Sequence, residues 1–65
     1  MKNVNELNEI ELIIEIEGGN VKVNNEKELE TVKELCKKLM YSQGFYGRLL
    51  RDLEGIKKEN LPIIL

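Results

Sequence analysis

Hydrophobic and polar residues alternate strictly near the start of the chain. Between residues 9 and 17, one set of alternate positions is Glu, broken only by Ile13, and the other set is aliphatic: Ile10, Leu12, Ile14 and Ile16. A period of two residues is typical of a strand with one buried face. We therefore predict a half-buried strand here.

The residues after this segment predict a turn and a second strand. Gly18, Gly19 and Asn20 tolerate a positive φ, and two central Gly residues suit a tight hairpin turn. A two-residue loop would pair Ile16 with Val21 and place all the apolar residues on one face. The pattern thus predicts a β-hairpin over residues 9 to 24.

From Asn25 the period changes to three or four residues, which indicates a helix over residues 25 to 41. Asn25 and Glu28 have the spacing of a capping box, and Glu34 and Lys38 can pair across one turn. We interpret Cys36 as a small buried hydrophobe. The apolar stripe comprises Leu29, Val32, Leu35, Cys36, Leu39 and Met40.

A second helix is predicted over residues 42 to 55, with Ser42 as its N-cap and Gly55 at its end. One continuous bent helix over residues 26 to 55 is the alternative, because Gly weakens a helix without forbidding it. The apolar segment 60 to 65 is expected to add a strand or to cross to another subunit. The expected fold is α+β, with the order ββαα and an extended C-terminal segment.

Composition excludes several classes of site. The chain has 65 residues, no His and one Cys, so an internal disulfide, a zinc-ligand set and a His-activated nucleophile are all excluded. Its carboxylates alternate on solvated faces without a clustered acid and base, so we expect no catalytic residue, metal or cofactor, and no enzyme. A chain this short has a small core, so we expect a homo-oligomer.

Charge and hydropathy bear on the surroundings of the protein. The N-terminal residues lack the apolar core of a signal peptide and no apolar run could span a membrane, so we expect a cytoplasmic protein. The net charge of −2 argues against broad coating of nucleic acid. Residues 1 to 17 carry five Glu and one Lys, whereas most of the positive charge lies later in the chain.

The segment from residue 42 to residue 55 differs in composition from the rest of the chain. It holds the only Phe, both Arg, one of the two Tyr and three of the five Gly. A helix start offers free amides to an anion, Arg side chains add charge-assisted contacts, and an aromatic ring can stack on a base. The segment therefore predicts a nucleotide or phosphate site, although it lacks a phosphate-loop Lys and a GxGxxG pattern. The candidate ligand-binding residues are Ser42, Gln43, Gly44, Phe45, Tyr46, Arg48 and Arg51.

A purely structural explanation of the same residues stays open. Gly44 and Gly47 would then permit a close helix crossing, Phe45 would belong to the core, and Arg48 would only pair with Asp52 at i,i+4.

The run SQGFYGRLL, residues 42 to 50, resembles small uncharacterised proteins encoded by phages and mobile elements of low-GC Gram-positive bacteria. The resemblance covers nine residues. It implies an accessory protein of the bacterial cytoplasm that acts by binding and blocks a host defence system.

Three functions follow as hypotheses. In the first, an oligomer sequesters a nucleotide-type signal without chemistry. In the second, the same surface docks on a protein such as a host defence component, with Phe45, Tyr46 and Arg48 as anchors. In the third, the two helices form a DNA-binding helix-turn-helix, against which Asp52 and Glu54 argue because phosphates repel them.

Overall fold

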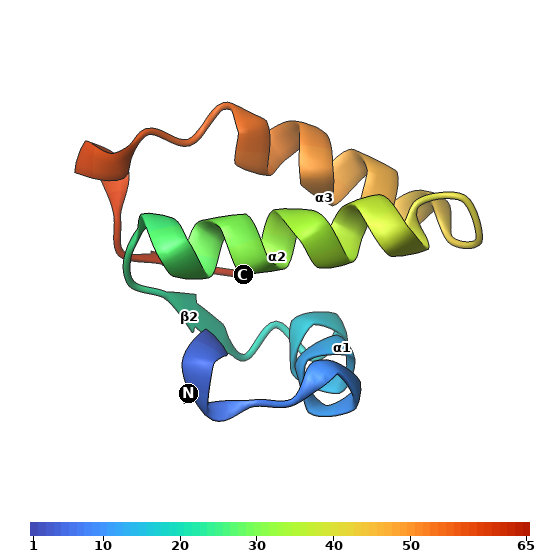
Figure 1. Cartoon of the computed structure of the whole chain (residues 1–65), viewed down its shortest axis with the longest axis horizontal. Helices are drawn as coiled ribbons and strands as arrows, with labels where there is room; N and C mark the ends of the chain where they lie inside the picture. Colours follow the sequence, from blue (N-terminus) through green and yellow to red (C-terminus); the bar gives the residue numbers. More distant parts are fainter.

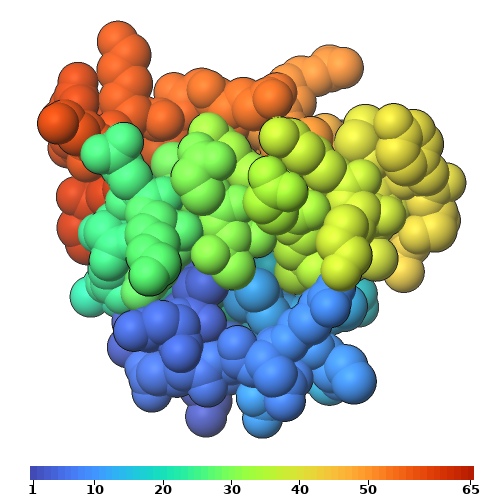
Figure 2. Space-filling model, viewed as in Figure 1, coloured from blue at the N-terminus to red at the C-terminus, as the bar shows by residue number.

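The computed structural model describes residues 1 to 65 and has an α+β architecture (Figure 1). Three α-helices pack with one small sheet, and α2 lies between α3 on one side and α1 with the N-terminal residues on the other (Figures 1 and 2). The elements in chain order are β1 (Lys2–Asn3), the 3-10 turn η1 (Val4–Glu6), α1 (Glu9–Glu17), β2 (Val21–Val23), α2 (Glu26–Leu39), α3 (Gly44–Glu54), the 3-10 turn η2 (Lys58–Asn60) and β3 (Ile63–Ile64).

The sheet is built around β2, which has a neighbour on each side. β1 runs parallel to it, with Lys2 beside Val21, and β3 runs antiparallel to it, with Ile63 beside Val23. Val21 and Val23 are fully buried as predicted. The C-terminal residues thus add a strand to the chain's own sheet, which is one of the two paths expected for them.

The hairpin predicted for residues 9 to 24 is wrong in its first half, because Glu9–Glu17 form the helix α1. Asn8 begins this helix with a full capping box: its side chain accepts a hydrogen bond from the Glu11 amide at 2.9 Å, and the Glu11 carboxylate accepts one from the Asn8 amide at 3.0 Å. The helix ends in a Schellman motif, in which the Gly19 amide donates to Ile16 and the Asn20 amide to Glu15. The residues expected to turn a hairpin therefore end a helix, and the order ββαα is not observed.

The helical conformation of α1 divides the four alternating aliphatic residues into two pairs. Leu12 and Ile16, one turn apart, are each 3% exposed and join the core. Ile10 and Ile14 are 71% and 62% exposed. A strand would have placed all four side chains on one face. The helix instead leaves Ile10 and Ile14 outside the core.

The predicted helix over residues 25 to 41 is confirmed as α2, but its polar contacts differ from those expected. The Asn25 side chain caps the helix by accepting from the Glu28 amide at 2.9 Å. The Glu28 side chain, only 6% exposed, accepts from the backbone and side-chain amides of Asn24 instead of returning to Asn25. Lys38 pairs with Glu9 of α1 at 2.7 Å and not with Glu34.

The second predicted helix is confirmed as α3, separated from α2 by a turn, so the single bent helix is not observed. Its start differs from the prediction, which made Ser42 the N-cap. Gln43 occupies the N-cap position, but its side chain makes no capping hydrogen bond. The Ser42 hydroxyl instead donates to the Leu39 carbonyl at 3.1 Å. Gly55 ends the helix as expected.

One hydrophobic cluster joins all the larger elements. Leu61, Ile63 and Leu65 of the C-terminal segment pack against it. Its buried members are Val4, Leu12, Ile16, Val21, Val23, Leu29, Val32, Leu35, Cys36, Tyr46, Leu50 and Leu53.

The Schellman end of α1 yields a test with a matched pair of variants. Gly19 has a φ of 69°, a conformation that costs a side-chain-bearing residue about 1–2 kcal/mol. Gly18 has a φ of −81°, and a Cβ there would lie 3.5 Å from the Ile14 carbonyl, an ordinary contact. Urea unfolding should show Gly19→Ala destabilised by about 1–2 kcal/mol and Gly18→Ala close to the parent protein. Equal stabilities for the two variants would contradict the helix end described here.

Candidate functional site

Most of the predicted site residues lie at the surface around the start of α3. One residue of the set, Tyr46, is buried at 0% exposure and belongs to the core. The exposed members are Ser42, Gln43, Gly44, Phe45, Arg48 and Arg51.

Tyr46 has a structural position that does not suit the role predicted for it. Its ring is inaccessible, so the stacking of a ligand base on Tyr46 is contradicted by its burial. Its hydroxyl donates a hydrogen bond to the Glu17 carboxylate at 3.0 Å, which joins α3 to the end of α1. Burial, the hydrogen bond to Glu17 and the negative charge of Glu17 raise the pKa of Tyr46 to about 12.

The two glycines at the start of α3 differ in their surroundings. A Cβ on Gly44 would meet nothing within 4 Å, whereas one on Gly47 would lie 3.8 Å from the Met40 Cβ, so only Gly47 fits the helix-packing explanation. The amides of Gly44 and Phe45 donate to no acceptor within the protein. The backbone at Gly44 is therefore open, but the prediction holds only in part. The amides of Ser42 and Gln43, two other residues of the predicted site, both donate to the Leu39 carbonyl, at 3.1 and 3.0 Å, and are not free for an anion.

The two arginines of α3 are free of ion pairs. The Arg48–Asp52 pair considered for the structural explanation is absent, since the ion pairs of the protein join Glu30 to Lys33, Glu34 to Lys37 and Glu9 to Lys38. Arg48 and Arg51 are exposed and available to a partner.

A shallow hollow of about 270 Å³ lies beside the start of α3, lined by Glu17, Gln43 and Phe45. We call it the Glu17 hollow. The Phe45 ring is 51% exposed and meets the Tyr46 ring edge to face, with the centroids 5.1 Å apart. Glu17 is the residue that sequence reasoning missed, because only the fold brings it to Gln43 and Phe45. Its carboxylate opposes an anion at this place.

The outer face of α1 continues from this hollow. Ile10, Ile14 and Glu17 follow one another at steps of four and three residues, so they lie on one side of the helix. We call these three residues the α1 outer face. It carries two of the largest exposed aliphatic side chains of the protein, and Phe45 lies at its Glu17 end.

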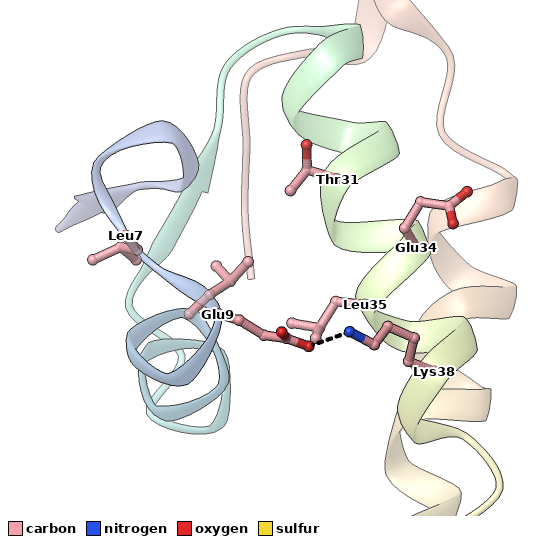
Figure 3. A pocket seen from close by; sticks show the side chains of 7 residues that line it. Leu7, Glu9, Thr31, Glu34, Leu35 and Lys38 are labelled. Atoms are coloured by element: carbon pink, nitrogen blue, oxygen red, sulfur yellow. Dashed lines mark hydrogen bonds and ion pairs between the residues drawn. The ribbon is translucent and has the colours of Figure 1, made fainter.

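A second hollow, of about 250 Å³, lies between α1 and α2 (Figure 3). Its apolar wall is formed by Leu7, Leu12 and Leu35, and the Glu9–Lys38 ion pair crosses its rim (Figure 3). Because both partners of this pair are more than half exposed, it contributes little to stability. No buried side-chain polar atom is left without a hydrogen-bond partner.

Other kinds of site find no support in the arrangement of side chains. No three His, Cys, Asp or Glu side chains are grouped so that they could hold a metal ion. The Cys36 thiol is buried, and burial raises its pKa, so it stays protonated as expected for a core residue. None of the helices has the length and apolar character needed to cross a membrane.

Comparisons with protein families, curated proteins and solved structures found no match to this chain.

The Tyr46–Glu17 contact predicts an alkaline transition. The pKa of Tyr46 is about 12 in the folded protein and near 10 when the chain is unfolded, so the proton is held more tightly in the folded state. The stabilisation is complete below pH 10 and is lost as the pH rises toward 12, which should lower the free energy of unfolding by about 2–3 kcal/mol.

Tyr46→Phe provides the control for this transition, because it removes the titrating group and keeps the ring. Urea unfolding measured from pH 9 to pH 12 should show a smaller decline for the variant, and the difference between the two curves isolates Tyr46 from the lysines. Parallel curves would show that the Tyr46 hydroxyl is not held in the core next to Glu17.

Proposed function

We propose that this chain is a non-enzymatic binding protein that docks on another protein through the α1 outer face. The observation that carries the proposal is the exposure of Ile10 and Ile14, 71% and 62%, one helical turn apart on the same side of α1. Fully burying an Ile side chain is worth about 1.5–3 kcal/mol. These two residues are the largest unused source of binding free energy on α1.

The surroundings of this face favour a protein partner. Phe45 is exposed next to Glu17, and aromatic side chains are enriched among the residues that dominate protein interfaces. Phe45 therefore keeps the anchoring role predicted for it, whereas the buried Tyr46 supports the surface from below. Arg48, one turn beyond Phe45 on α3, is exposed and free to contribute at the rim.

Sequestration of an anionic nucleotide-type ligand is the second candidate. The free amides of Gly44 and Phe45 and the unpaired Arg48 and Arg51 favour it. It is second because the buried Tyr46 cannot stack on a base and because Glu17 places a negative charge beside the same helix start.

Two other hypotheses lose support. α2 and α3 run side by side and antiparallel, unlike the helices of a helix-turn-helix, which cross at about 90–120° (Figure 1). Self-association was expected partly from the apolar tail, but Leu61, Ile63 and Leu65 pack against the chain's own core. Two copies meeting through α1 would also oppose the four Glu of each helix.

The resemblance of residues 42 to 50 to phage and mobile-element proteins suggests the setting of this binding. We infer a role in the bacterial cytoplasm, with a host defence protein as the target that the docking blocks.

The proposal predicts different effects for two equally exposed isoleucines. Ile14 on α1 and Ile64 on β3 are each 62% exposed. Ile14→Ser should weaken binding to the target about tenfold, as expected for an interface anchor, and Ile64→Ser should leave it unchanged. The target would be identified by photo-crosslinking from position 10 in bacterial cells, purified, and titrated with each variant by calorimetry.

Two results would contradict the proposal. One is an equal loss of affinity for the target in Ile14→Ser and Ile64→Ser, because the α1 outer face would then contribute no more to binding than β3. The other is a melting temperature that rises with a nucleotide in the parent protein but not in Arg48→Ala, which would favour sequestration instead.

A further inference from the structure

We propose that the Glu17 hollow receives a Lys or Arg side chain of the docked protein. This inference rests on the proposed function, since the partner is the protein that covers Ile10 and Ile14. It reverses the charge of the ligand that the sequence suggested for the start of α3.

The lining of the hollow has the chemistry that binds an organic cation. One oxygen of the Glu17 carboxylate accepts from the Tyr46 hydroxyl at 3.0 Å, and the other has no hydrogen-bond partner in the protein. Gln43 also lines the hollow and has a side-chain carbonyl that can accept a hydrogen bond, and Phe45 contributes an exposed ring. A carboxylate, an amide oxygen and an aromatic ring together suit an ammonium or guanidinium group.

The hollow is also held in shape by contacts within the protein. Tyr46 lies beneath it and fixes both neighbours: its hydroxyl holds Glu17, and its ring packs edge to face with Phe45. The two recognition groups therefore lose little freedom when a cation binds, which lowers the cost of association.

The net charge of α1 favours a basic partner. Four Glu lie on this helix and no Lys or Arg does. Only Glu9 has a cationic partner, Lys38, whereas Glu11, Glu15 and Glu17 accept hydrogen bonds from uncharged groups. The free amides at the start of α3 offset part of this charge, and the arginines of α3 do not line the hollow.

The spacing along α1 specifies the partner further. Ile10 and Glu17 are seven residues apart on a helix, which corresponds to about 10 Å along its axis. A partner helix would match this surface with two apolar residues at i and i+4 and a Lys or Arg at i+7. We therefore infer an amphipathic helical segment with a basic residue at one end of its apolar stripe.

The test uses two synthetic peptides on the parent protein and three variants. Both peptides are Ala-rich and helical with Leu at i and i+4; one carries Arg at i+7 and the other carries citrulline, its neutral isostere. Glu17→Gln removes the charge of the hollow and keeps an acceptor for Tyr46, and Glu54→Gln makes the same change of net charge on an exposed residue of α3. Ile14→Ser tests the apolar part of the surface.

Dissociation constants would be measured by NMR titration at low and physiological salt. The parent protein should bind the Arg peptide about three- to tenfold more tightly than the citrulline peptide. Glu17→Gln should abolish this preference and Glu54→Gln should keep it. Ile14→Ser should weaken both peptides alike.

The outcomes separate the two proposals. If the parent protein binds both peptides equally and Ile14→Ser weakens both, the cation site is wrong and the docking face stands. If the Arg preference persists in Glu17→Gln, the cation binds elsewhere. If Ile14→Ser has no effect, or if neither peptide binds, the docking face and the cation site are both contradicted.

Discussion

The helical state of residues 9 to 17 is the constraint on which the rest of the structure depends. A strand would bury Ile10, Leu12, Ile14 and Ile16 together, whereas the helix sends Leu12 and Ile16 into the core and leaves the other pair outside. It also places Glu9 next to Lys38 of α2 and Glu17 next to Tyr46 of α3. The exposed apolar surface and the hollow beside it both follow from this one choice of conformation.

Tyr46 links the stability of the protein to the shape of its candidate binding surface. Its ring fills the core and meets the Phe45 ring edge to face, and its hydroxyl donates a hydrogen bond to Glu17 of α1. Tyr46, which the sequence suggested would stack on a ligand base, instead contacts the side chains of Glu17 and Phe45 that line the surface. This arrangement lets a 65-residue chain without a disulfide present a preorganised surface.

The sequence predicted α2 and α3 because each has a clear apolar stripe of helical period, although the N-cap of α3 was placed one residue early. It failed at α1 because the signals there conflicted. Alternation favours a strand, and Gly18-Gly19-Asn20 suits either a hairpin turn or a Schellman end. The deciding signal was Asn8 followed by Glu11. The same spacing at Asn25 and Glu28 correctly indicated a helix start, although only the Asn25 half of that capping box forms. The strands β1 and β3 have two residues each, which is too short to show an alternating pattern in the sequence. At the site, the exposed start of α3 could be predicted, but Glu17 could not, because it meets Tyr46 across 29 residues of sequence.

The most direct test of this account measures the solvent exposure of the four aliphatic side chains that alternate along α1. Methyl NMR with a soluble paramagnetic agent would report Ile10, Leu12, Ile14 and Ile16 separately in the free protein. The account predicts strong broadening at Ile10 and Ile14 and protection at Leu12 and Ile16, together with helical Cα chemical shifts from Glu9 to Glu17. Equal protection of all four methyl groups, with shifts typical of a strand, would contradict the helix and remove the docking surface with it.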